Sequence, residues 1–206
     1  MRYVTYSLKN ENIQQIGVVH ENRVFPLRKL VGDQWAGPFP ASLLELIQIG
    51  PEAWRRMRLL AGAFSCRDQY PLEEVRLYAP IPRPAKNIVC LGRNYAGHAA
   101  EAARTRGQEV KVPDFPVYFT KPATTVTGPH DPIPWDKAVT QQVDYEAELA
   151  VVIGVGGKDI PAGRALDHVF GYTIINDVSA RICSSGTCSG SRARAWTASA
   201  PWGRGS

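Results

Sequence analysis

The 206-residue sequence lacks the segments that send a protein into or across a membrane. Its first residues hold no apolar stretch typical of a secretory signal, and no apolar run approaches the roughly 20 residues that cross a bilayer. We therefore expect a cytoplasmic protein with no membrane partner. Cysteine is scarce as well: the four cysteines share no spacing typical of a metal or redox motif. We predict four reduced thiols, with Cys90 in the core.

Acidic residues are absent from the last part of the chain. Residues 181–206 hold four arginines and no Lys, Asp or Glu, so residues 1–180 carry only +1 of the net charge of +5. A surface that binds nucleic acid is expected to run through the folded part of a protein. We therefore expect no nucleic acid partner. The remaining composition, 44% apolar and 21% charged, is that of an ordinary globular protein.

Residues 1–80 predict a small N-terminal α/β domain. Residues 16–27 have the pattern of a hairpin around a polar turn. Two short amphipathic helices are expected at 42–50 and 51–62, the second starting at a proline and ending at a glycine. A strand that starts at residue 74 gives way to a proline-rich stretch typical of a linker, so we place a domain boundary near residue 80.

Beyond this boundary, strands outnumber helices. We expect strands at 87–92, 115–122, 143–154 and 171–179, a helix at 94–107, and one or two helical turns at 162–170. Strands with few helices between them predict a mixed, β-rich domain over 81–181 rather than a doubly wound parallel sheet. The expected fold class is α+β and rich in β-structure.

Two glutamates in the run DYEAELAVVIG are the first candidates for a functional site. Side chains alternate along a strand, so Glu146 and Glu148 share one face with Asp144 and lie roughly 7 Å apart. Like charges so placed repel each other unless a cation holds them or one is protonated. A divalent cation with hard oxygen ligands, Mg²⁺, Mn²⁺ or Ca²⁺, satisfies them. The alternative is a half-exposed strand whose acidic residues face water.

Asp177 strengthens the metal interpretation. It ends the apolar strand YTIIN, where a chain leaves a sheet and often supplies a site residue. Three carboxylates at neighbouring strand ends suit an octahedral cation that keeps positions open for a substrate. The alternative is that Asp177 caps a turn together with Ser179.

His98 and Glu101 are the second candidate pair. At i and i+3 on a helix they share one face, so Glu101 can orient His98 and raise its basicity. That arrangement suits an acid–base pair able to deprotonate water. The alternative is a solvated helix face. His20, His130 and His168 have no comparable partner, and we interpret them as surface or turn residues.

Four ordered motifs together resemble the fumarylacetoacetate hydrolase family: NIVCLGRNYAGHAAEA, FPVYFTKPATTVTGPHDPI, DYEAELAVVIG and GYTIINDVSAR. The resemblance covers about residues 80–181, and the N-terminal stretch is similar to the small leading domain of the family's bacterial members. It implies a catalytic domain built as a mixed β-roll, a homodimer, and a bound Mg²⁺ or Mn²⁺. By the family's pattern, Glu146, Glu148 and Asp177 hold the metal.

The resemblance also assigns catalytic residues and chemistry. The family's histidine–glutamate dyad falls on His98 and Glu101, its F-x-K-P lysine on Lys121, and the arginine after its metal aspartate on Arg181. The implied reaction is hydrolytic or lytic cleavage of a C–C bond in a small 1,3-dicarbonyl or 2-oxo acid, such as an acylpyruvate, fumarylacetoacetate or oxaloacetate. Family members also decarboxylate oxaloacetate, or isomerise and hydrate dienoic oxo acids, so these outcomes stay open.

The chain departs from the family's pattern after Arg181. Members continue with a D-[LI]-Q segment and then R-G-K-S-x-D, whose lysine stabilises developing negative charge, whereas here Ile182, Cys183 and Ser184 follow. A reading-frame slip accounts for the change. If the gene encoded D-L-Q-F-G-H-V-Q-W-F-P-G-K-S-L-D-G-F, loss of the first base of the Asp codon would give I-C-S-S-G-T-C-S-G-S-R-A-R-A-W-T-A, the sequence of residues 182–198.

Two interpretations of residues 182–206 therefore stand: an out-of-frame tail on a C-terminally truncated chain, or a divergent, flexible basic segment. Under the first, the β-roll is incomplete and its open edge favours aggregation. The alternative to a working hydrolase is an inactive fragment, or a binding module with a basic tail.

Overall fold

The computed structural model describes residues 1–64, 67–92, 95, 114–137, 140–180, 196–198 and 202–203. The chain divides into two compact units, one of residues 1–83 and 126–206 and one of residues 84–125. Within the described ranges, no helix combines the length and the apolar character that a bilayer crossing requires. The division into 1–80, 81–181 and 182–206 stays a prediction.

The N-terminal strands of the first unit form an antiparallel arrangement. β1 (Arg2–Leu8) pairs with β2 (Gln15–His20) and β5 (Val75–Leu77), and β3 (Arg23–Pro26) pairs with β2 and β4 (Tyr70–Pro71). The β2–β3 turn has Glu21 at φ 44° and Asn22 at φ 60°. Two left-handed residues between paired His20 and Arg23 fit the twist of a two-residue hairpin, which confirms the predicted hairpin.

Three short helices cover this part of the sheet: α1 (Leu27–Val31), α2 (Leu43–Ile49) and α3 (Pro51–Ala61). The Ser42 side chain caps α2 by accepting a hydrogen bond from the Glu45 backbone N–H at 3.2 Å. Gly50, at φ 109°, joins α2 to α3 through a backbone conformation that favours glycine. Buried faces of the helices pack with Tyr3, Ile16 and Phe170 into the main core. Both predicted helices are confirmed.

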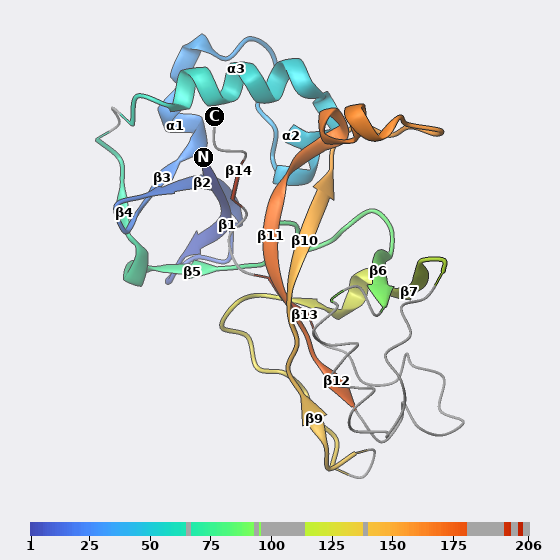
Figure 1. Cartoon of the computed structure of the whole chain (residues 1–206). Coiled ribbons are helices and arrows are strands. Elements are labelled where there is room, and N and C mark those ends of the chain that lie inside the picture. The colour runs from blue at the N-terminus through green and yellow to red at the C-terminus, as the bar shows by residue number, and fades with distance from the viewer. Residues whose placement is uncertain are drawn as a thin grey trace. The chain divides into compact units, whose positions relative to one another are not determined.

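A long antiparallel ribbon dominates the rest of the first unit. β10 (Ala147–Ile153) and β11 (Val169–Asp177) lie side by side, and at one end β9 (Val143–Asp144) and β12 (Ser179–Ala180) continue as a second pair (Figure 1). The expected single strand over 143–154 is therefore wrong: it breaks at Tyr145 and Glu146. The reason is a change of partner, because β9 pairs with β12 while β10 pairs with β11.

Short strands complete the described sheet. β8 (Val126–Thr127), β13 (Trp196–Ala198) and β14 (Trp202–Gly203) join it, with β13 parallel to β8 and antiparallel to β11. β14 pairs with both β1 and β11. The sheet is thus mixed but mainly antiparallel. The expected fold class, α+β and rich in β-structure, is confirmed.

The two faces of the β10–β11 ribbon differ in burial. The inner face carries Glu148, Ile175 and Thr173, and the last two are buried. The outer face carries Leu149, which is 60% exposed, and its cross-strand neighbour Ile174, which is 49% exposed. Near the other end the register shifts between Val152 and Ile153, so that one residue of β11, Phe170, has no opposite partner in β10. Such a residue is a β-bulge.

The second unit contains β6 (Ile88–Gly92), β7 (Val117–Lys121) and the 3₁₀ helix η3 (Ala123–Thr125). β6 and β7 pair antiparallel, which confirms the two predicted strands. Cys90 is buried and not in a disulfide, as predicted. The helix expected at 94–107 lies outside the described residues, apart from Tyr95 alone.

Candidate metal centre

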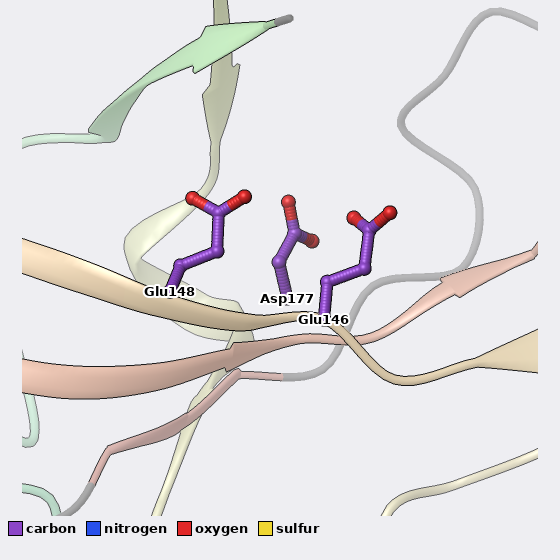
Figure 2. A group of neighbouring side chains, drawn as sticks. All are labelled: Glu146, Glu148 and Asp177. Carbon is purple, nitrogen blue, oxygen red and sulfur yellow. The ribbon is translucent and has the colours of Figure 1, made fainter. Parts of the chain in front are cut away.

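Three carboxylates meet where β10 begins and β11 ends. Each of Glu146, Glu148 and Asp177 offers one oxygen, and the three oxygens lie within 4.8 Å of one another. Figure 2 shows the three side chains pointing to the same side of the ribbon. Glu148 belongs to β10, Asp177 is the last residue of β11, and Glu146 immediately precedes β10. The structure therefore brings together the three residues proposed as metal ligands.

Hydrogen bonds with Asn176 and Asp177 position Glu146 just before the start of β10. The Asp177 backbone N–H donates to the Glu146 carbonyl oxygen at 2.7 Å. The Glu146 backbone N–H donates to Oδ1 of the Asn176 side chain at 3.0 Å. An amide side chain thus replaces a backbone carbonyl in the ladder, which fixes Glu146 although the strand is interrupted there. We did not single out Asn176 in the sequence, although it stands within the N-D-x-S run.

Ser179 lies beside two of these residues. Its hydroxyl is 3.3 Å from the Asp177 carbonyl oxygen and 3.5 Å from Oε2 of Glu146. The turn contact that we considered as an alternative role for Asp177 therefore uses its backbone carbonyl. The Asp177 carboxylate belongs to the acidic cluster.

Burial makes this cluster electrostatically costly. Asp177 is only 2% exposed, and both glutamates are half-buried. Two unit charges at 4.8 Å repel each other by about 3 kcal/mol if the effective dielectric constant is about 20. The arrangement does not match acidic residues that simply face water. A bound cation would offset the repulsion among all three carboxylates.

The donor set fits a hard divalent cation. Three oxygens that lie within 4.8 Å of one another leave a point no more than about 2.8 Å from each, against ligand distances of about 2.0–2.1 Å for Mg²⁺ and 2.3–2.6 Å for Ca²⁺. The three carboxylates are therefore close enough together to share one ion. Three carboxylate oxygens with room for further ligands suit Mg²⁺, Mn²⁺ or Ca²⁺ rather than a soft metal, which prefers thiolates.

The other predicted catalytic residues are described in part. Lys121 is the last residue of β7 in the second unit, and its side chain is fully buried. A lysine side chain is fully buried only when neighbouring polar or charged groups compensate its charge. We therefore expect such groups around the Lys121 ammonium. His98, Glu101 and Arg181 lie outside the described residues. The roles of all four stay predictions.

The remaining histidines differ from one another. His20 is partly exposed and stacks on Phe64 with ring centroids 4.3 Å apart, and His130 is exposed in a turn, as expected. His168 is not a simple surface residue, because it is half-buried and its ring Nδ1 lies 2.9 Å from the Val155 carbonyl oxygen. That contact joins the two ends of the 154–168 connection, and nothing in the sequence around His168 indicated it.

Comparison with known proteins agrees with this architecture. A sequence profile described as fumarylacetoacetate (FAA) hydrolase C-terminal matches residues 87–204. The chain is 40% identical over 192 residues to the oxaloacetate tautomerase YisK of Bacillus subtilis (strain 168), a match that covers 88% of this chain and 61% of that protein. The chain thus spans about three fifths of the length of this relative.

Solved structures share the fold. One is a fumarylacetoacetate hydrolase from the psychrophile Exiguobacterium antarcticum, with a TM-score of 0.67 and 32% identity over 95% of this chain and 62% of that one. Another is a maleylpyruvate hydrolase from Sphingobium sp. SYK-6 in complex with manganese(II) and pyruvate, with a TM-score of 0.70 and 22% identity over 98% of this chain and 67% of that one. The chain belongs to the fumarylacetoacetate hydrolase family.

Proposed function

We propose that this chain carries the metal centre of a divalent-metal-dependent enzyme that acts on small 2-oxo acids or 1,3-dicarbonyl compounds. The observation that carries the proposal is the convergence of Glu146, Glu148 and the buried Asp177 in a member of this family. Mg²⁺ or Mn²⁺ is the expected ion. Cleavage of a C–C bond, as in acylpyruvates, fumarylacetoacetate or oxaloacetate, is the first candidate reaction.

Each of the candidate residues has a distinct role in the proposed reaction. When bound, a divalent cation supplies Lewis-acid polarisation of the substrate's oxygen atoms. The three carboxylates hold the cation and set the net charge of the loaded centre at −1, which favours retention of the ion. His98, oriented by Glu101, deprotonates a water molecule for attack on a carbonyl carbon. Lys121 and Arg181 supply positive charge toward substrate carboxylates and the developing enolate.

Tautomerisation is the second candidate reaction, favoured by the 40% identity to an oxaloacetate tautomerase. A keto–enol shift moves one proton and breaks no C–C bond, so it needs no attacking water. The two reactions are separable by product. The ultraviolet absorbance of the enol reports tautomerisation of oxaloacetate, whereas release of pyruvate from an acylpyruvate reports cleavage. Pyruvate and CO₂ from oxaloacetate would indicate decarboxylation, and a changed dienoic acid would indicate isomerisation or hydration.

A metal titration tests the centre itself. Mn²⁺ binding, followed by electron paramagnetic resonance, should be lost when Glu146→Gln and Glu148→Gln are combined. Glu73→Gln is the matched control, because Glu73 is exposed and lies outside the cluster. Equal Mn²⁺ affinity in the wild-type chain and the double variant would refute the proposed centre.

An inactive fragment is the alternative outcome. It is supported by the anomalous composition of residues 182–206 and by the span of about three fifths of the relative's length. The frame-slip hypothesis predicts that a one-base shift after codon 181 restores a G-K-S codon run in the gene. Nucleotide sequencing across codon 182 checks this. A chain with the frame restored should then exceed the given chain in turnover by at least tenfold.

The expected homodimer also remains a proposal. Supporting it, the outer face of the ribbon exposes a row of apolar side chains: Leu149, Val151, Ile153 and Ile174. Polar substitution of Leu149 and Ile174 by Ser should lower self-association in sedimentation experiments. Unchanged sedimentation of a dimeric sample would place the interface elsewhere. A cytoplasmic location also stays a prediction.

A further inference from the structure

A concave site lies within the first unit, at the end of the ribbon away from the acidic cluster. It is an open groove of about 510 Å³. Its wall on one side is α3, and on the other side it is the 3₁₀ helix η4 (Ala162–His168) with the start of β11. The residues that matter for its chemistry are Trp54, Arg55, Arg58, Arg164, His168 and Phe170.

One face of α3 supplies two guanidinium groups to the groove. Residues 51, 54, 55 and 58 all line it, and this spacing places them on one side of the helix. Arg55 and Arg58 form no ion pair with any described residue. Arg55 Nε donates to the Pro51 carbonyl oxygen at 3.3 Å, which is a neutral partner, so the charge of both side chains remains available to a ligand. Arg56, on the same helix, does not line the groove and donates to the Gln34 carbonyl oxygen.

The opposite wall adds one more arginine and the histidine. Arg164 Nε lies 3.5 Å from Oδ2 of Asp167, and both side chains are largely exposed. Exposed pairs of this kind are worth no more than about 1 kcal/mol, so Arg164 can turn to a stronger anion. Three guanidinium groups and one carboxylate line the groove, and together these four groups carry a net charge of +2.

The groove has a rigid apolar floor. Trp54 and Phe170 meet edge to face with ring centroids 5.0 Å apart, and both are buried. The Trp54 indole N–H donates to the carbonyl oxygens of Leu46 and Ile47, at 2.9 and 3.1 Å, which fixes the ring. A ligand would thus meet cations at the rim and aromatic surface beneath.

The connection of residues 154–168 lies against the groove, and three hydrogen bonds join its two ends. The backbone N–H groups of Gly154 and Val155 donate to the His168 carbonyl oxygen at 2.8 and 3.2 Å. The His168 ring returns a bond to the Val155 carbonyl oxygen, so Nδ1 carries the hydrogen. A Cβ on Gly157 would lie 2.9 Å from Cε1 of His168, so glycine allows the backbone to approach the ring. The imidazole is therefore held in one orientation.

From these observations we propose that the groove binds a small organic anion: a phosphate ester or a dicarboxylate with a short apolar body. Guanidinium groups match the oxygens of both groups bidentately, and the aromatic floor accepts the body. The site is separate from the metal centre and does not depend on it. Its ligand is thus recognised by oxyanion charge over an apolar surface, without chelation to a metal.

The test uses inorganic phosphate and succinate as probes of the full chain, with isothermal calorimetry and ¹⁵N-resolved NMR at fixed ionic strength. We expect at least one probe to bind saturably and to shift the Trp54 indole N–H signal. Arg58→Gln should weaken that binding at least tenfold, and Arg56→Gln, the matched control, by less than twofold. Tighter binding of phosphate identifies the phosphate-ester class, and tighter binding of succinate the dicarboxylate class.

Two results would overturn the proposal. One is the absence of saturable binding of either probe by the wild-type chain below about 50 mM, since weaker binding carries no specificity. The other is equal weakening by Arg58→Gln and Arg56→Gln, which would mean that only overall charge matters. Circular dichroism of each variant establishes folding. The combined Glu146→Gln and Glu148→Gln variant should keep its anion affinity, so failure of the metal centre and failure of the groove remain distinguishable.

Discussion

The two ends of the β10–β11 ribbon carry opposite charge. At one end Glu146, Glu148 and Asp177 gather three carboxylates, and at the other Arg58 and Arg164 belong to a groove with three guanidinium groups. The residues of β11 between these ends span about 25 Å at the usual rise per residue. One sheet segment thus supports a site suited to a cation and a site suited to an anion.

The two sites also differ in how the chain builds them. The acidic cluster is part of the ladder itself, because the Asp177 backbone N–H donates to Glu146 and the Asn176 side chain accepts from it. The groove instead arises where a helix packs against the ribbon, and its arginines come from elements more than 100 residues apart in sequence. Local strand geometry therefore determines the first site, whereas tertiary packing determines the second.

Asp177→Asn should have the largest effect, and it tests the acidic end of the ribbon. It keeps the size of the side chain but removes one anionic ligand. We expect Mn²⁺ affinity to fall at least 100-fold, which is about 2.7 kcal/mol. Phosphate or succinate affinity should change by less than twofold. Calorimetric titration with each ion measures both, and parallel loss of both affinities would show that the two ends are not independent.

Gly154→Ala should destabilise the packing of Trp54 and Phe170 beneath the groove. An added Cβ would lie 2.7 Å from Cζ2 of Trp54 and 3.0 Å from Cβ of Phe170. Overpacking of this kind costs about 1–3 kcal/mol in the free energy of unfolding, which urea denaturation measures. Gly156→Ala is the control, because a Cβ there would meet nothing within 4 Å. If the two variants lose equal stability, Trp54 does not pack against Gly154 as described.

Tyr3→Phe should change stability slightly and leave both sites intact. Tyr3 stacks on Phe170 with centroids 5.8 Å apart, and its buried hydroxyl has no hydrogen-bond partner among the described residues. Removal of that hydroxyl should stabilise the fold by up to about 1 kcal/mol, measured by urea denaturation at pH 7. Destabilisation by a similar amount would show that the hydroxyl has a partner.

Tyr3→Phe should also change how the free energy of unfolding depends on pH. Burial raises the pKa of Tyr3, and nearby Arg58 lowers it to a smaller extent. The unfolded chain therefore loses this proton near pH 10, before the folded chain does, and the stability contributed by Tyr3 falls as the pH rises above about 10. Tyr3→Phe should lose less stability than the wild-type chain between pH 9 and 11. An identical loss in both chains would contradict the raised pKa.

The sequence allowed prediction of the elements whose signals are local. Alternating residues and a polar turn predicted the β2–β3 hairpin, and Pro51 and Gly62 bounded α3 closely. A continuous strand over 143–154 is predicted because the alternation of apolar residues gives no sign of where a strand changes its pairing partner. The break follows from that change of partner, and the Asn176 side chain, 30 residues from Glu146, accepts the Glu146 backbone N–H there.

The candidate sites were predictable to different degrees. Strand parity and the end of β11 pointed to Glu146, Glu148 and Asp177, since their proximity follows from adjacent strands. No pattern along the chain joins Arg58 to Arg164. Nor does the sequence show that the outer face of the ribbon stays exposed, because Leu149 and Ile174 have the same apolar character as core residues.

The bulge at Phe170 lies between the 154–168 connection and the regular part of the ribbon. Phe170 has no opposite partner in β10, whereas the pairing from Gly171 to Asn176 runs without a shift. A residue added to or removed from the connection can therefore be taken up at the bulge, and the pairing that sets Glu148 opposite Ile175 keeps its register.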